Sequence, residues 1–141
     1  TIDTDKLLCL NNMHVLVPKK ENKIDINYLL GIINSKLLNW YYQTLNPEKG
    51  EALAEVKKSN VARLPIKEIS SKNRKEHDEI VKHVDQLLKL NRELIGERLQ
   101  SKNDEIKQRI EHSEEKINRA VYDLYDLKKE EIEIIEGKTD E

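Results

Sequence analysis

Apolar residues recur at helical spacing over most of the chain, and the longest runs lie in its second half. One apolar stripe extends over residues 80–99, and a second extends over residues 106–124. Spacing of three and four residues places such positions on one face of a helix. The segment 100–104 between the stripes is polar and typical of a turn. We therefore predict an antiparallel helical hairpin, with one continuous long helix as the alternative.

The first half of the chain has shorter apolar runs. Residues 12–17 are apolar and rich in β-branched types, and Pro18 ends the run, which favours a strand. A helix is expected after Asp25, a suitable N-cap, and before Pro47. Gly31 inside that helix costs about 1 kcal/mol relative to Ala, so it indicates a tight packing contact.

Weaker patterns complete the prediction. Residues 52–56 and 59–66 are interpreted as short extended pieces, and residues 128–136 as a short acidic helix that ends at Gly137. The expected fold class is α+β: a small strand-containing recognition lobe over residues 1–74 and a long antiparallel helical hairpin with its terminal helix over residues 75–141. The chain starts within a pattern, so we expect one compact fragment of a larger protein.

Charge is distributed unevenly along the chain. Charged residues make up 37% of the sequence and hydrophobic residues another 37%, which is more charge than an average domain carries. Residues 1–75 hold 13 Lys and Arg against 8 Asp and Glu, a balance of +5, and the remainder holds 12 against 19, a balance of −7. Phosphate would repel the acidic half. If the chain binds nucleic acid, the first half makes the contact.

The sequence lacks the residue patterns of several kinds of chemistry. Cys9 is the lone cysteine, which excludes an internal disulfide or thiolate cluster and agrees with a reducing cytoplasm. No apolar run approaches the ~20 residues of a membrane span. Glycine-rich phosphate loops and metal-binding His spacings are absent. We therefore expect no enzyme, no metal and no cofactor within this fragment.

A basic segment connects the two predicted parts. Residues 45–75 hold eight Lys and Arg against four Glu. Lysine contacts phosphate, while Arg and Asn can also pair with guanine and adenine edges. A solvated loop is the alternative interpretation of this composition. The candidate DNA-contacting residues are Lys57, Lys58, Asn60 and Arg63, followed by Asn46 and Lys49.

The order of these pieces resembles a known family. The stretch YLLGIINSKL at residues 28–37, the pair Tyr41-Tyr42, Leu64-Pro65-Ile66, and VYDLYDL at residues 121–127 occur in sequence. This order is similar to the C-terminal specificity domain of TaqI-like methyltransferases and of type IIG restriction–modification enzymes, over residues 11–136. The chain departs from the family pattern at Lys67, Asn118 and Asp126, where Pro, Asp and Gly are common, and these departures concern turns.

The resemblance implies a DNA target-recognition domain of a type II restriction–modification enzyme. Its partners would be double-stranded DNA and an adenine-specific methyltransferase domain of the same parent chain, with a fused endonuclease as a further candidate. S-adenosylmethionine, with magnesium as a further candidate, would bind in those other domains. The competing interpretation is a helical dimerisation module that does not bind DNA, with Asn91 setting the register of the seam. Asn34 and Ser35 are interpreted as structural residues that cap a helix or bridge to a loop.

Overall fold

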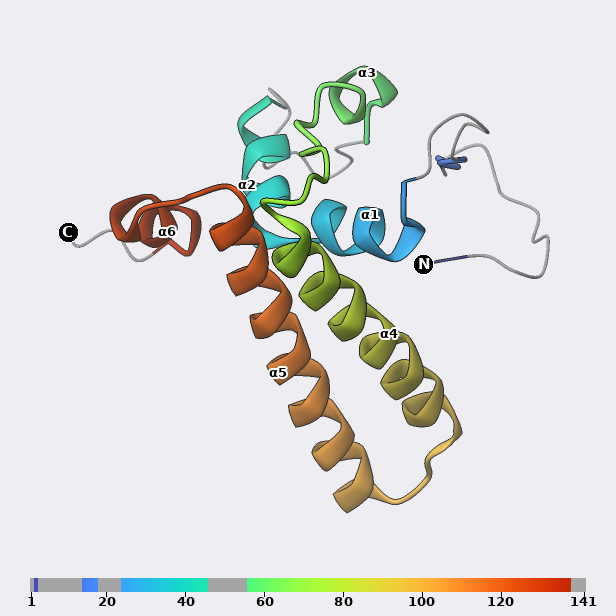
Figure 1. The fold of residues 1–141 in the computed structure, drawn as a ribbon. Helices are drawn as coiled ribbons and strands as arrows, with labels where there is room; N and C mark the ends of the chain where they lie inside the picture. The colour runs from blue at the N-terminus through green and yellow to red at the C-terminus, as the bar shows by residue number, and fades with distance from the viewer. Residues whose placement is uncertain (1, 3–13, 18–23, 46–55, 138–141) are drawn as a thin grey trace.

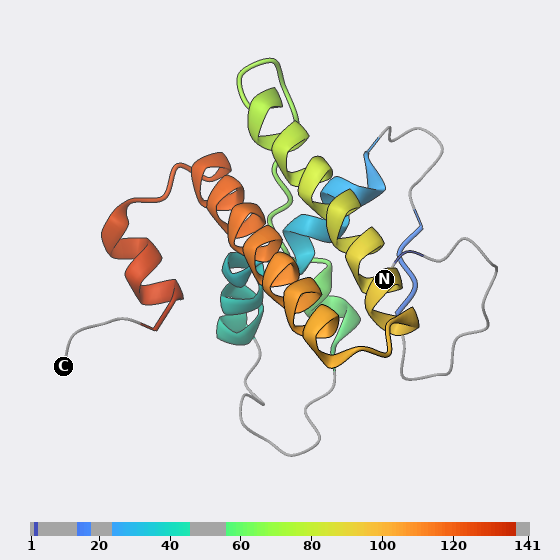
Figure 2. The ribbon, with the colours of Figure 1, turned by 90° about the horizontal axis from the view of Figure 1, so that it is seen from below.

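A computed structural model of the chain shows a long two-helix hairpin with smaller helices packed at one end (Figure 1). The structure describes residues 2, 14–17, 24–45 and 56–137. The helices are α1 (Ile26–Ile33), α2 (Lys36–Leu45), α3 (Lys58–Val61), α4 (Arg74–Gly96), α5 (Gln100–Leu124) and α6 (Lys129–Ile135). Helices α4 and α5 lie side by side along their length, and α6 lies beyond the end of α5, away from α4 (Figures 1 and 2). The predicted hairpin is therefore confirmed.

The predicted α+β class is wrong, because the described residues contain helices and irregular segments but no strand. Of the expected strand at residues 12–17, the first two lie outside the described part, and residues 14–17 are exposed and belong to no element. A β-branched run becomes a strand only when a neighbouring strand pairs with it. Of the other expected extended pieces, residues 52–55 lie outside the described part, and residues 58–61 form the single turn α3.

The helix expected after Asp25 is present but is divided into α1 and α2. The Asp25 carboxylate accepts hydrogen bonds from the backbone N–H groups of Asn27 at 2.8 Å and Tyr28 at 3.2 Å, which confirms the predicted N-cap. The division occurs at the buried Ser35, whose hydroxyl donates to the Ile32 carbonyl at 2.7 Å and accepts from the Leu38 N–H at 3.3 Å. A serine hydroxyl that bonds to nearby backbone competes with helix continuation.

A neighbouring helix completes the start of α2. The Lys36 N–H donates to the Asn118 carboxamide oxygen on α5 at 2.8 Å. Asn118 is held in turn by a bond from its amide nitrogen to the Glu114 carbonyl at 2.9 Å. The interpretation of Ser35 as a capping residue is confirmed. The structure describes α2 as far as Leu45, and the helix stop expected before Pro47 lies outside the described residues.

Close packing of α1 against α4 forms the centre of the core. A Cβ built on Gly31 would lie 2.6 Å from the Ile80 Cγ2 and 2.9 Å from the Val84 Cγ2. The predicted tight contact at Gly31 is thus confirmed, and its partners are two buried side chains of α4. The core cluster joins these residues to Tyr28 and Val121, and so it contains residues from both sides of the boundary expected at residue 75.

The hairpin turn lies earlier than the sequence predicts. The polar residues 100–104 belong to the first turns of α5, and the connection is formed by residues 97–99. There the Glu97 carboxylate accepts hydrogen bonds from the N–H groups of Arg98 and Leu99, both at 2.9 Å. The start of α5 is polar because it lies at the free end of the hairpin, far from the packed helices (Figure 1).

A left-handed turn connects α5 to α6. Asp126 has a φ of 56°, the Leu127 N–H donates to the Tyr122 carbonyl at 3.1 Å, and the Asp126 N–H donates to the Asp123 carbonyl at 3.1 Å. This pattern is a Schellman motif, which favours glycine at the left-handed position. The turn therefore explains why glycine suits position 126. The short acidic helix predicted over residues 128–136 is confirmed as α6, and Gly137 follows it with a φ of 69°.

Candidate nucleic-acid interface

The basic residues predicted to contact DNA surround α3, between the ends of α2 and α4. Lys57 precedes this helix, Lys58 begins it and Arg63 follows it, and all three are exposed. Asn60 is only 8% exposed, so its side chain lies mainly inside the fold. Asn46 and Lys49 lie outside the described residues. The structure thus brings the described candidates together in one short segment, with Asn60 facing inward.

We call residues 56–67 the α3 segment, and its first end is fixed by two side chains. His14 Nε2 lies 2.5 Å from the Val56 carbonyl oxygen, which accepts a hydrogen bond. The Lys57 N–H donates to the Tyr42 hydroxyl on α2 at 2.9 Å. Residues 14 and 56 are far apart in the sequence, so this contact ties the start of the α3 segment to a distant part of the chain. The contact gives the exposed His14 ring a structural partner.

The second end of the α3 segment is fixed by two further tyrosines. The Tyr125 hydroxyl donates to the Pro65 carbonyl at 2.5 Å and accepts from the Lys67 N–H at 3.2 Å. The Tyr28 hydroxyl donates to the Lys67 carbonyl at 2.7 Å. Burial raises the pKa of both Tyr28 and Tyr125 above the ordinary tyrosine value, so both hydroxyls keep their protons and can donate. Three backbone groups are therefore satisfied by two phenol oxygens.

Lys67 is a structural cation rather than a surface charge. Its ammonium group donates to the Leu124 carbonyl at the end of α5 and to the Asp126 carboxylate at 3.0 Å. It also lies 5.7 Å from the centre of the Tyr125 ring. A cation at a helix C-terminus is stabilising because it neutralises the unpaired carbonyl groups. One of the eight bases counted in residues 45–75 is therefore engaged by contacts within the chain.

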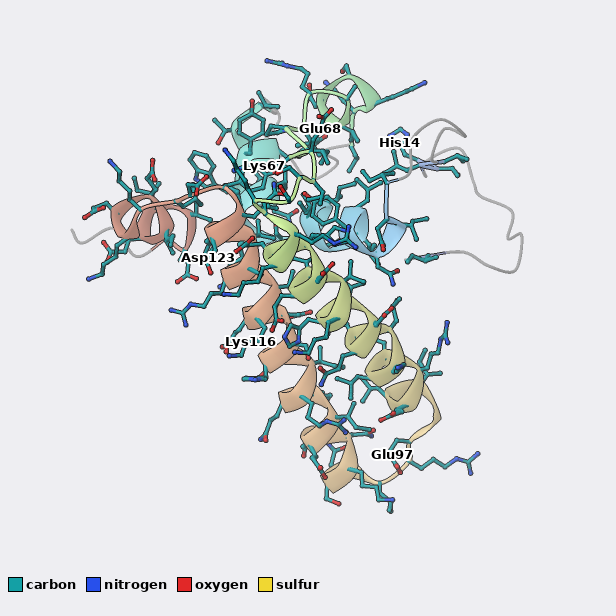
Figure 3. The ribbon with its side chains drawn as sticks, viewed as in Figure 1. His14, Lys67, Glu68, Glu97, Lys116 and Asp123 are labelled. Carbon is teal, nitrogen blue, oxygen red and sulfur yellow. The ribbon has the colours of Figure 1, made fainter. Side chains whose placement is uncertain are left out.

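The sequence analysis did not identify the tyrosine contacts. Tyr28, Tyr42 and Tyr125 entered only as parts of family-like stretches. A phenol ring signals burial in a sequence pattern, whereas the partner of its hydroxyl depends on tertiary structure. Figure 3 shows His14 and Lys67 at the α3 end of the molecule and Glu97 at the free end of the hairpin.

Two buried histidines of α4 also serve the fold. His77 Nδ1 lies 2.8 Å from the Asp78 carboxylate, and His83 Nε2 lies 3.1 Å from the Glu79 carboxylate. These hydrogen bonds lower the pKa of both carboxyl groups. The His77 ring also packs against Tyr28, with centroids 4.9 Å apart. Within the described residues, no cluster of three or more His, Cys, Asp or Glu could hold a metal ion.

The apolar stripe of α4 is mostly used inside the chain. Ile80, Val84 and Leu90 are at most 2% exposed, whereas Ile95 is 88% and Leu99 is 57% exposed. The buried part of this stripe therefore cannot also form a seam with a second chain. In the part of the chain that the structure describes, no helix is long and apolar enough to cross a membrane.

Comparison with known proteins identifies one family. Residues 1–66 match the model of the TaqI-like C-terminal specificity domain, which confirms the resemblance for this part of the chain. The match includes the first end of the α3 segment, α3 itself and the candidate DNA-contacting residues. No curated protein and no solved structure matches the chain.

Proposed function

We propose that this chain is the DNA target-recognition part of a restriction–modification enzyme. The observation that carries the proposal is the match of residues 1–66 to the specificity-domain family. The exposure of Lys58 and Arg63 on the matched part supports it. The chain would supply sequence specificity, and catalysis would belong to other domains of the parent protein.

The parent protein, in this proposal, is a cytoplasmic adenine-specific DNA methyltransferase, with a fused endonuclease as a further component. Its methyltransferase domain binds S-adenosylmethionine and docks beside the present chain on double-stranded DNA. Magnesium belongs to the endonuclease. The residue types of the α3 segment suit the division of work between the domains, because Lys and Arg can contact phosphates and base edges.

The α3 segment would contact DNA through two kinds of interaction. Lys57 and Lys58 neutralise phosphates, which contributes affinity without sequence preference. Arg63 presents a fork of donors that can pair with the O6 and N7 atoms of guanine in the major groove. The acidic second half of the chain carries a balance of −7 over residues 76–141, so phosphate repulsion favours binding on the α3 side. The intramolecular use of the α4 stripe favours this function over the dimerisation alternative.

Salt dependence tests the proposal. Binding of a duplex to the full-length protein should weaken as salt rises, because each neutralised phosphate releases counterions. Lys58→Ala should lower the slope of log K against log salt by about one. Lys129, exposed on α6 in the acidic half, provides the matched control, and Lys129→Ala should leave the slope unchanged. Equal slopes for wild type, Lys58→Ala and Arg63→Ala would refute the assignment of the interface.

A further inference from the structure

The α3 segment is held at both ends by side chains that contact its backbone. At one end, His14 and Tyr42 bond to Val56 and Lys57 at 2.5 and 2.9 Å. At the other end, Tyr125 bonds to Pro65 at 2.5 Å and to Lys67 at 3.2 Å. The anchoring residues come from the N-terminal segment, α2 and the end of α5, so three separate parts of the fold converge on one connection.

The interior of the α3 segment is also ordered by local contacts. The N–H groups of Asn60 and Val61 both donate to the Lys57 carbonyl at 3.0 Å, and the Arg63 N–H donates to the Asn60 carbonyl at 3.1 Å. Asn60 is buried. Leu64 and Ile66 pack against the core. Lys58 and Arg63 are consequently carried at a fixed separation on a short, internally bonded turn.

Fixed placement matters differently for the two kinds of DNA contact. A lysine on a flexible stem finds a phosphate from many backbone positions, whereas a bidentate contact to a base edge needs the guanidinium in one place. Binding is also weakened when only a fraction of the protein has the competent conformation. Loosening the α3 segment should therefore reduce discrimination between sequences more than it reduces non-specific affinity.

We propose that Tyr42 and Tyr125 are positioning residues for sequence readout, because their hydroxyls hold the two ends of the α3 segment in the DNA-competent conformation. This inference rests on the proposed function. Neither tyrosine needs to touch DNA. The phenol ring supports packing, and the hydroxyl alone carries the positioning role, so a Tyr→Phe substitution separates the two contributions.

The test uses the full-length protein and a duplex library with a randomised central block. Wild type, Tyr42→Phe and Tyr125→Phe are compared for enrichment of the preferred sequence and for affinity toward one fixed duplex that is not enriched. Tyr41→Phe is the matched control, because Tyr41 neighbours Tyr42 on α2 and has a hydroxyl without a hydrogen-bond partner among the described residues. Circular dichroism shows that each variant is folded at the assay temperature. If Tyr125→Phe unfolds, Tyr42→Phe alone carries the test.

Tyr42→Phe should lower enrichment by roughly 2- to 10-fold, the factor that corresponds to the loss of one net hydrogen bond, and Tyr125→Phe, which loses two, should lower it by at least as much. Affinity for the fixed duplex should change by less than about twofold, and Tyr41→Phe should change neither quantity. Unchanged enrichment in a folded Tyr42→Phe variant would overturn the inference while leaving the proposed function intact. If Lys58→Ala and Arg63→Ala also change nothing, or if wild type enriches no sequence, the proposed function itself fails.

Discussion

The contact at Gly31 predicts that the same substitution has opposite effects at two helical glycines. In Gly31→Ala the new methyl group would lie 2.6 Å from the Ile80 Cγ2 and 2.9 Å from the Val84 Cγ2. Comfortable carbon–carbon contacts are about 3.5–4.0 Å, so both neighbours must move by roughly 1 Å. Both are buried, at 0% and 2% exposure, and have little room to move.

Two opposing free-energy terms set the net effect of Gly31→Ala on stability. Overpacking a filled core costs about 1–3 kcal/mol, and replacing glycine by alanine inside a helix returns about 1 kcal/mol. Because the closest contact is far below van der Waals distance, we expect overpacking at the upper end of its range and a net destabilisation of about 1–2 kcal/mol. Gly96, the last residue of α4, has no atom within 4 Å of a built Cβ. Gly96→Ala should therefore stabilise the protein by up to about 1 kcal/mol.

Urea unfolding followed by circular dichroism measures both effects. The midpoints of Gly31→Ala and Gly96→Ala should move in opposite directions with little change in slope, and melting temperatures should differ by roughly 5–10 °C. Val84→Ala removes one of the two clashing methyl groups, so Gly31→Ala should cost less in that background than in wild type. A Gly31→Ala variant as stable as wild type, or additive effects with Val84→Ala, would refute the close approach of α1 to α4.

Three further predictions follow from local structure. Ser35→Ala should lower the free energy of unfolding in urea by about 1–2 kcal/mol, because it removes the hydroxyl that caps α2. Ser101→Ala, at an exposed position at the hairpin tip, should be neutral, and equal effects of the two substitutions would contradict the cap. Asp126→Gly should raise the melting temperature. Glycine adopts a φ of 56° without strain, which contributes about 1 kcal/mol, and the exposed ion pair between Asp126 and Lys67 that is lost contributes less. A lower melting temperature would show that the ion pair dominates. Hydrogen bonds from two backbone N–H groups lower the pKa of Glu97 below its ordinary 4.5, so the stabilising contribution of Glu97 is complete above pH 4.5 and is lost as the pH falls through the lowered pKa. The urea midpoint of Glu97→Gln should therefore change less than that of wild type below about pH 4.5. Parallel curves of midpoint against pH for the two proteins would contradict this.

The helical part of the fold could be predicted from local pattern alone. The hairpin, the Asp25 cap and a tight contact at Gly31 were each predicted from residues within a few turns, and the structure confirms all three. The strand at residues 12–17 was predicted from composition, but residues 14–17 have no strand to pair with among the residues that the structure describes. The hairpin turn was placed too late, because polarity at the start of α5 reflects distance from the core rather than a turn.

The candidate interface could be located but not resolved from the sequence. Charge counting pointed to residues 45–75, and the structure places Lys57, Lys58 and Arg63 on the surface there. Charge counting could not distinguish Lys67, which is bound within the chain, from the exposed cations, and it could not show that Asn60 is buried. Both facts depend on contacts with distant residues. For the same reason, the bond from Lys57 to Tyr42 could not be predicted from sequence spacing.

Site-specific photo-cross-linking tests the central claim most directly. After Cys9 and every other native cysteine of the full-length protein are replaced by serine, the protein can be labelled at Ser59→Cys, an exposed position between Lys58 and Asn60, or at Ser101→Cys, an exposed position at the free end of the hairpin. A benzophenone at position 59 should cross-link to double-stranded DNA, and the yield should fall as salt rises. The label at position 101 should give little product. Cross-linking from position 101 that equals or exceeds the yield from position 59 would contradict the assignment of the α3 segment as the surface that reads DNA.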